Sequence, residues 1–382
     1  MVANVSDNIP AVKSVGKPKS PRGVSVDIRS QTEVTAEAGL NRKTSPARRP
    51  AVMADVARLA GVSHQTVSRV LNDHPSVSRA TRTRVVAAIE ELDYRPNSAA
   101  RTLVTRRSKV IGVVSFDTTL YGPASTLSGI EQAARRAGYF VSIASAKDRD
   151  GEAVQQALER LSRQFVEGIV IIAPRRATVE ALRGAPSGLP MVVVEGGDGD
   201  GRPVVCVDQA GGARLVTRHL LDQGAPTVWH VAGPADWLEA QSRVDGWRSV
   251  LRDAGAAEPE LLRGDWSPAS GYAQGQVLAE RSDVRAVFVA NDQMALGVLR
   301  AFHERGVRVP HDVLIAGFDD IPESAYFTPP LTTVRQDFDT VGRRSIDLLL
   351  DQINGTRPEP AALVPAELVI RQSTVGTPRH AG

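Results

Sequence analysis

Five hydrogen-bonding side chains, with no carboxylate among them, lie within residues 64–69: His64, Gln65, Thr66, Ser68 and Arg69. At the period of an α-helix they share an outer face, and the inner face is formed by Val67, Val70 and Leu71. An α-helix fills the major groove of B-form DNA, where Gln pairs with adenine and Arg with guanine. These side chains therefore predict a helix that reads DNA bases. The alternative is the solvated face of a helical hairpin in a larger α-helical domain.

Two further helices are expected around this one. A first short helix would pack through Val56, Leu59 and Ala60 and end at Gly61, where a positive φ is easily adopted. Ser63 is placed to cap the polar helix, and Ser78 to cap a third helix whose inner face is Val85, Ile89 and Leu92. Two short helices, a glycine turn and a polar second helix are typical of a helix-turn-helix.

The charge distribution agrees with a nucleic-acid partner. The whole chain of 382 residues has a formal charge of only +3. Between Arg42 and Lys109, however, fourteen Lys and Arg residues stand against five acids, so this segment carries about +9. A basic segment on a nearly neutral body is typical of a protein with one DNA-binding face.

Cysteine content and hydropathy indicate the compartment. Cys206 is the only cysteine and lies in an apolar run, so we expect a small core residue in a reducing environment. No stretch approaches the ~20 apolar residues that span a bilayer, and the N-terminus lacks the apolar core of a signal peptide. We therefore expect a cytoplasmic protein with no membrane partner.

From Val110 onwards, short apolar runs alternate with amphipathic segments. The expected strands are Val110–Phe116, Phe140–Ser145, Gly168–Ala173, Met191–Glu195, Val204–Val207, Thr227–Ala232, Ala286–Ala290 and Val313–Phe318. The expected helices include Ala124–Ala137, Glu152–Gln164, Gly212–Gln223, Ala240–Ala254, Pro268–Glu280 and Gln293–Arg305. This alternation predicts an α/β core of two parallel sheets flanked by helices. Asn291 and Asp319 directly follow strands, so both are expected in the crevice where such folds bind ligands.

Signatures of catalysis are missing from the sequence. It contains no Gly-x-Ser-x-Gly elbow, no phosphate-binding Gly-x-x-x-x-Gly-Lys-Ser/Thr loop and no His-Glu-x-x-His zinc motif. Asp319 and Asp320 form an adjacent carboxylate pair, but such neighbours more often cap a turn or bind hydroxyls. We expect no enzymatic activity, no cofactor and no metal ion. An α/β enzyme and a sugar-binding protein without DNA regulation remain the alternatives.

Seven stretches of the chain match the motifs of a known family in the same order: Asp55–Asn72, Tyr94–Asn97, Gly264–Trp266, Val289–Gly297, Gly317–Asp320, Pro329–Thr333 and Gln336–Phe338. In these the sequence resembles the lac repressor family of bacterial transcription regulators, over about residues 48–375. The resemblance implies an N-terminal helix-turn-helix headpiece, a hinge helix and a core of two periplasmic-binding-protein-like subdomains.

The domain limits implied are 1–47 for a disordered tail, 48–94 for the headpiece, 95–108 for the hinge, 109–207 with 337–365 for the core N-subdomain, 208–336 with 366–375 for the C-subdomain, and 376–382 for a short tail. The resemblance also implies a homodimer that reads a pseudo-palindromic, double-stranded operator. The C-terminal leucine-heptad helix of the family's namesake, which joins two dimers, has no counterpart here, so a dimer is expected.

Eleven residues of this sequence match family positions that contact DNA. The recognition helix contributes His64, Gln65 and Arg69, and His64 stands where the namesake has Tyr, which implies a different base step in the operator. Expected phosphate contacts are Thr66, Ser68, Asn72, Ser78 and Thr81; the alternative for them is capping and solvation. In the hinge, Leu103 matches the residue that wedges into the minor groove, with Asn97 and Ala100 on the same segment. A plain linker is the alternative for the hinge.

Family positions that bind the effector match ten residues. Those expected to hydrogen-bond sugar hydroxyls are Arg243, Asn291 and Asp319, because a buried hydroxyl needs a partner. Trp266 would pack on the apolar face of a pyranose. The other residues expected to line the effector pocket are Leu120, Pro123, Glu195, Gln293, Gln336 and Phe338. Ordinary core packing is the alternative for Trp266 and Phe338, and a surface ion pair for Arg243.

The sequence also departs from the family's namesake. Phe116, Asp148 and Ile172 replace a Ser, an Arg and an Asn of its pocket, and Glu195 and Glu239 replace an Asp and a Ser. The resemblance therefore predicts a sugar-responsive repressor whose effector is a galactoside or related glycoside with a different aglycone or second sugar. Whether that effector induces or co-represses stays open at this point.

Overall fold

The structure is a computed structural model, and it describes residues 49, 51–95, 107–116, 118–146, 151–182, 188–195, 201–356 and 361–375. The chain divides into two compact units, Met1–Arg95 and Pro96–Gly382, which are described separately. The tails expected at 1–47 and 376–382, the hinge residues Asn97, Ala100 and Leu103, and Asp148 lie outside the described residues.

Three short helices form the described part of the first unit: α1 (Met53–Ala60), α2 (His64–Leu71) and α3 (Arg79–Glu91). Gly61 ends α1 with a φ of 63°. Ser63 caps α2 by accepting a hydrogen bond from the Thr66 N–H at 3.2 Å, and Ser78 caps α3 by accepting one from the Thr81 N–H at 3.3 Å. The helix-turn-helix prediction is confirmed.

Val56, Val67, Val85 and Tyr94 are buried together at the centre of this unit. One core prediction is wrong, because Leu59 is 46% exposed. The small residue Ala57 takes the inner position instead, since it lies beside Val56 and Ala60 on the same helical face.

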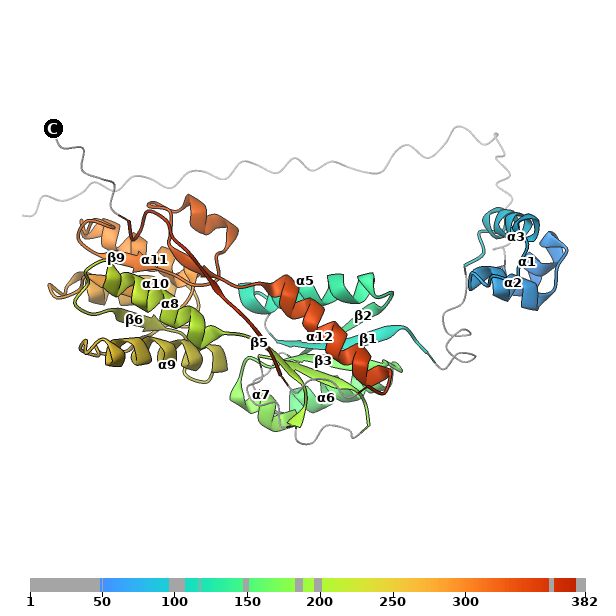
Figure 1. The fold of residues 1–382 in the computed structure, drawn as a ribbon, viewed down its shortest axis with the longest axis horizontal. Coiled ribbons are helices and arrows are strands. Elements are labelled where there is room, and N and C mark those ends of the chain that lie inside the picture. Colours follow the sequence, from blue (N-terminus) through green and yellow to red (C-terminus); the bar gives the residue numbers. More distant parts are fainter. Residues whose placement is uncertain are drawn as a thin grey trace, which may run out of the picture. The chain divides into compact units, whose positions relative to one another are not determined.

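The core begins with a six-stranded sheet in the order β11-β5-β4-β3-β1-β2, all strands parallel, which we call lobe 1. Its strands are β1 (Val110–Phe116), β2 (Phe140–Ala146), β3 (Gly168–Ile172), β4 (Met191–Val194), β5 (Val204–Val207) and β11 (Ala361–Val364). Its helices are α5 (Tyr121–Arg136), α6 (Gly151–Ser162), α7 (Arg176–Ala181) and α12 (Phe338–Ile353). Helices α5 and α12 cover one face of the sheet, and α6 and α7 lie on the other (Figure 1).

Lobe 2 is built on a four-stranded parallel sheet in the order β7-β6-β8-β9. Its elements are α8 (Gln209–Asp222), β6 (Trp229–Ala232), α9 (Leu238–Asp253), β7 (Leu262–Arg263), α10 (Pro268–Ala279), β8 (Ala286–Val289), α11 (Asp292–Glu304), β9 (Leu314–Ala316) and the 3-10 helix η3 (Pro322–Tyr326). An antiparallel pair, β10 (Thr333–Arg335) and β12 (Glu367–Val369), lies beside α8. Helices flank both sheets, so the α/β prediction is confirmed.

The chain passes between the lobes three times. It leaves lobe 1 after β5, where Asp208 caps α8. It returns after β10, where Asp337 caps α12, and leaves again between β11 and β12. No helix in the described part of the chain is long and apolar enough to cross a membrane.

Cys206 lies in β5 and is partly buried against the apolar side of lobe 1 that faces α6. Burial is the main cause that raises the pKa of its thiol to about 11. The residue is therefore only in part the core residue expected from the sequence.

Gly342→Ala is expected to destabilise the core by about 1–3 kcal/mol, because inserting a methyl group into a well-packed contact forces the neighbouring backbone to shift. Helices α5 and α12 approach closely at Gly129 and Gly342, and a Cβ at Gly342 would overlap the Gly129 backbone. Urea unfolding of both proteins measures the change. The control is Ser128→Ala on the exposed side of α5, expected within about 0.5 kcal/mol of wild type. Equal stability of both variants would show that the helices can separate without cost.

Candidate functional site

The outer face of α2 carries hydrogen-bonding groups that the first unit does not use. His64, Gln65 and Arg69 are exposed, and Thr66 and Ser68 are partly exposed. Among the described residues, no hydrogen bond or ion pair is formed by the side chains of His64, Gln65 or Arg69. Their donors and acceptors therefore face solvent on one side of a helix, as contact with base edges requires.

The expected phosphate contacts help to form the ends of the helices. Thr66 and Thr81 donate their N–H groups to the caps of α2 and α3, and the Asn72 side chain donates to the Ser68 carbonyl at 2.9 Å. These contacts fix the exposed hydroxyls near the ends of α2 and α3. A role toward phosphate stays a prediction.

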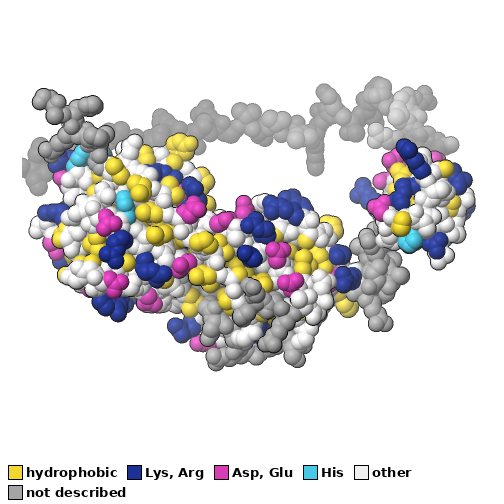
Figure 2. Space-filling view, viewed as in Figure 1, with side chains coloured by type: hydrophobic (Ala, Val, Ile, Leu, Met, Phe, Trp, Pro, Cys, Tyr) yellow, Lys and Arg dark blue, Asp and Glu magenta, His cyan; other side chains and the backbone are white. Residues whose placement is uncertain are grey.

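Lys and Arg side chains occur over the visible face of the first unit, with acids among them (Figure 2). Several of these cations are paired, since Arg58 lies 3.0 Å from Asp55 and Arg82 lies 2.5 Å from Asp73. The positive excess of the Arg42–Lys109 segment therefore comes mainly from the sequence on either side of the three helices.

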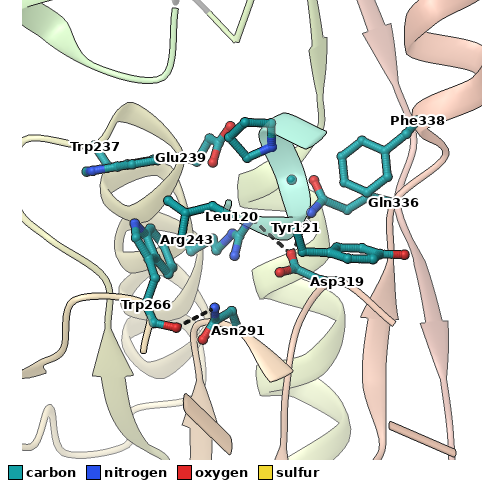
Figure 3. A pocket seen from close by; sticks show the side chains of 12 residues that line it. Leu120, Tyr121, Trp237, Glu239, Arg243, Trp266, Asn291, Asp319, Gln336 and Phe338 are labelled. Carbon is teal, nitrogen blue, oxygen red and sulfur yellow. Dashed lines mark hydrogen bonds and ion pairs between the residues drawn. The ribbon is translucent and has the colours of Figure 1, made fainter. Parts of the chain in front are cut away.

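A pocket lies between the lobes, at the carboxyl ends of strands (Figure 3). The residues that line it are Leu120, Tyr121, Gly122, Pro123, Trp237, Glu239, Arg243, Trp266, Asn291, Asp319, Gln336 and Phe338. Lobe 1 contributes the start of α5 and the first residue of α12. Lobe 2 contributes α9 and the loops after β7, β8 and β9.

Arg243 is the cation of the pocket and is only 2% exposed. Its Nε donates to the Gln209 side chain at 2.9 Å, its Nη1 donates to the Ala290 carbonyl, and its Nη2 lies 3.6 Å from the Asp319 carboxylate. The guanidinium carbon lies 3.8 Å from the centre of the Phe318 ring. These contacts hold the cation in place before a ligand arrives, which lowers the entropic cost of binding.

Two polar residues of lobe 2 are held equally firmly. The Asn291 side chain caps α11 through the Met294 N–H at 2.9 Å and donates to the Trp266 carbonyl at 3.1 Å. Gln336 donates to Asp319 at 2.7 Å and accepts from Gln209 at 2.8 Å. Arg243, Gln209, Gln336 and Asp319 thus form one hydrogen-bonded network on the lobe 2 side of the junction.

Backbone strain accompanies this network. Trp266 has a φ of 76° and Asp319 a φ of 108°, in the left-handed region that non-glycine residues rarely adopt. Such conformations cost about 1–3 kcal/mol each and tend to occur at functional sites, where the surrounding contacts impose them.

Burial changes the titration of the acids near the pocket. It raises the pKa of Asp319 to about 7, and the attraction of Arg243 offsets only part of this effect. Burial, followed by the neighbouring Glu239, raises the pKa of Glu195 to about 8. The Glu195 carboxylate accepts a hydrogen bond from the Val207 N–H at 3.2 Å, which acts in the opposite direction.

Glu195→Gln is expected to raise the Tm at pH 8 and to leave it unchanged near pH 4. Between the free-glutamate pKa of about 4.3 and the folded value of about 8, the folded state binds more protons, so stability falls as pH rises. Gln keeps the oxygen that accepts from Val207 and removes the charge. Thermal unfolding from pH 4 to 9 measures the difference, with Glu159→Gln on the exposed side of α6 as the control. A Tm difference that does not vary with pH would contradict the assignment.

The structure brings together most of the residues that the sequence assigns to the effector. Eight of the ten line the pocket, whereas Glu195 and Gln293 do not. Gln293 lies beside it and accepts a hydrogen bond from the Asn291 side chain at 2.9 Å. Phe116 and Ile172 are also absent from the lining, because both are buried in the core of lobe 1. The differences from the namesake at these two positions therefore concern the packing behind the pocket and not the groups that line it.

Four lining residues are not among the ten predicted: Tyr121, Gly122, Trp237 and Glu239, of which the sequence singles out Glu239 only as a replacement of the namesake's Ser. Tyr121 and Gly122 lie between the predicted Leu120 and Pro123 at the start of α5, so the first turn of a helix after a strand was an available signal. Trp237 precedes α9 and packs edge-on against Trp266, with ring centres 5.4 Å apart. Among the described residues, no group of three or more His, Cys, Asp or Glu could hold a metal ion.

A helix-turn-helix with unused donors on its second helix, and a two-lobed core with a polar pocket, together define a ligand-responsive DNA-binding regulator. Residues 52–97 match the model of the bacterial regulatory proteins of the lacI family, and residues 217–374 match the periplasmic binding protein-like domain. The lactose operon repressor of Escherichia coli K12 is 36% identical over 329 residues, which cover 86% of this chain and 91% of that protein. The chain belongs to the lacI family.

Solved structures of lacI-family regulators are similar to this chain in fold. The lac repressor dimer bound to operator and the anti-inducer ONPF matches with a TM-score of 0.79 and 34% identity, over 86% of this chain and all of that one. The complex of the transcriptional regulator CelR with cellobiose matches with a TM-score of 0.63 and 32% identity, over 85% of this chain and 99% of that one.

Proposed function

We propose that this protein is a homodimeric transcriptional repressor that binds a pseudo-palindromic operator and changes its operator affinity when a glycoside enters the pocket. The observation that carries the proposal is the set of hydrogen-bonding groups around Arg243, Asn291 and Asp319, fixed at the junction of the lobes. A polyol needs a partner for each buried hydroxyl, and this set supplies both donors and acceptors.

Base reading is assigned to His64, Gln65 and Arg69, and register on the phosphates to Thr66, Ser68, Asn72, Ser78 and Thr81. We assign Asn97, Ala100 and Leu103, which lie outside the described residues, to a hinge that contacts the minor groove. The effector would contact Leu120, Pro123, Arg243, Trp266, Asn291, Asp319, Gln336 and Phe338. Glu195 and Gln293 would act from beside the pocket.

Coupling between the two sites requires that the effector bind one arrangement of the lobes more tightly than the other. The network from Arg243 to Gln336 connects residues that a ligand would touch to the strand that leads back into lobe 1. We propose that a ligand biases this junction and so the segment between lobe 1 and the headpiece. The pocket is assigned a binding rather than a catalytic role, because its Asp319 is held by Arg243 and Gln336.

Fluorescence anisotropy tests the proposal. The full chain is titrated onto labelled palindromic DNA from upstream of its own gene, at several salt concentrations and with galactosides and other glycosides. Specific binding that weakens steeply with salt, and that a glycoside shifts, is expected. Release identifies an inducer and tightening identifies a co-repressor. The absence of specific DNA binding under every condition would refute the repressor assignment.

A further inference from the structure

Glu239 is an acid at the pocket that no other described residue engages directly. It lies in the first turn of α9, lines the pocket and is half-buried. In the part of the chain that the structure describes, its carboxylate has no hydrogen bond or ion pair. The start of α9 is fixed to lobe 1, because the Leu238 N–H donates to the Pro174 carbonyl at 2.9 Å and Arg175 lies 3.2 Å from Asp236. Glu239 is therefore held at the junction of the lobes.

Acids outnumber cations among the residues that line the pocket. Glu239 and Asp319 are the acids and Arg243 is the cation among these lining residues, while Glu195, beside the pocket, has a pKa raised to about 8 and is mostly protonated at pH 7. Arg243 is already committed to Asp319, Gln209 and the Ala290 carbonyl. Burial raises the pKa of Glu195 and of Glu239, and Glu239 contributes to the raised pKa of both Glu195 and Asp319. Arg243 acts on Glu239 through space and lowers its pKa in part, but the guanidinium itself is bonded to other groups, so the Glu239 carboxylate keeps its acceptor oxygens for a donor on a ligand.

We propose that the effector of this protein is an amino sugar or aminoglycoside whose protonated amine binds the Glu239 carboxylate. The inference rests on the proposed function and specifies its ligand. An ammonium group donates three hydrogen bonds, and its positive charge favours the ionised form of the Glu239 carboxyl, so the bond between them is charge-assisted. An ionised Glu239 repels phosphate and carboxylate groups, so sugar phosphates and uronic acids are expected to bind less tightly than the amines.

Two tryptophans give the amine a suitable surrounding. Trp237 immediately precedes α9, and its ring lies edge-on to Trp266 at the same side of the pocket as Glu239 (Figure 3). Aromatic rings bind the apolar face of a sugar and attract cations within about 6 Å of their centres. The hydroxyl-binding residues Asn291 and Asp319 come from other loops of lobe 2, so one sugar ring can use both groups of contacts.

The test uses pairs of ligands that differ only in the amine. Calorimetry with the full chain at pH 7 compares glucosamine with glucose, galactosamine with galactose, and the diamine of deacetylated chitobiose with cellobiose. At least one amine is expected to bind tenfold or more tightly than its neutral counterpart. Glu239→Gln is expected to reduce that preference to threefold or less, and the readout is the ratio of the amine's affinity to that of its neutral counterpart within the same variant. Glu159→Gln, on an exposed face of α6, is the matched control and is expected to keep the preference.

Each outcome separates the two proposals. Neutral sugars that bind as tightly as their amines would overturn the amine assignment and leave a sugar-responsive repressor. A preference for the amine that survives in Glu239→Gln would also overturn it, because another group would then hold the charge. If no sugar of either kind binds, the glycoside effector itself is refuted, and the operator titration shows whether DNA binding remains.

Discussion

Arg243→Ala is expected to remove the response to effector, with a loss of ligand affinity of at least about 100-fold. Removing one partner of a buried ion pair costs about 3–5 kcal/mol, because the remaining charge stays buried without compensation. Here Asp319 would lose the cation at 3.6 Å, and Gln209 and the Ala290 carbonyl would lose their donor. The same substitution is expected to lower the free energy of unfolding of the core. Operator affinity without effector should persist at temperatures where the variant is folded.

The measurements are ligand calorimetry, urea unfolding and operator anisotropy on the same preparation. Arg252→Ala removes an arginine from the exposed end of the same helix and should match wild type in all three. Arg243→Lys keeps the charge and loses the planar donor geometry, so an intermediate affinity is expected. A variant Arg243→Ala that responds at wild-type effector concentrations would exclude this residue from the ligand site.

Arg69→Ala is expected to weaken specific operator binding by about 30-fold or more. A bidentate contact from Arg to a guanine is worth about 1–3 kcal/mol, and a dimer loses it in both half-sites. The Arg69 side chain is exposed and lies on the outer face of α2, so the stability of the three-helix unit should not change.

Competition anisotropy with operator and with unrelated DNA measures the effect. Arg58→Ala removes an exposed arginine from α1 whose guanidinium already pairs with Asp55 at 3.0 Å, and it should change operator affinity little. A loss that is equal on operator and on unrelated DNA would indicate that Arg69 only neutralises phosphate.

The first unit and most of the sheets could be predicted because their signals are local. Gly61, Ser63 and Ser78 mark helix ends within a few residues, and every expected strand from Val110 to Phe318 corresponds to an observed one. The helix α12 was not predicted, because its buried face includes Gly342 and Ser345, which interrupt the apolar period. Its register is set by close contact with α5, which no local pattern contains.

Short strands and loop residues were missed for a related reason. Strands β10 and β12 have three residues each and form only because they pair with each other across the chain. In the pocket, Asn291 and Asp319 could be placed because they follow strands, whereas Trp237 reaches the pocket from a loop whose position depends on the contact between Leu238 and Pro174. That Glu239 lines the pocket with no hydrogen bond or ion pair to another described residue likewise follows only from the three-dimensional arrangement.

The single cysteine makes this protein well suited to site-specific spectroscopy. The thiolate is the form that reacts with maleimides, and a thiol with a pKa of about 11 is almost entirely protonated at neutral pH. Because Cys206 is also partly buried in β5, a cysteine introduced on the surface would be labelled selectively while Cys206 stays in place. A pair of fluorophores at Arg163 and Arg252, which are exposed on different lobes, would report the distance between the lobes during a ligand titration.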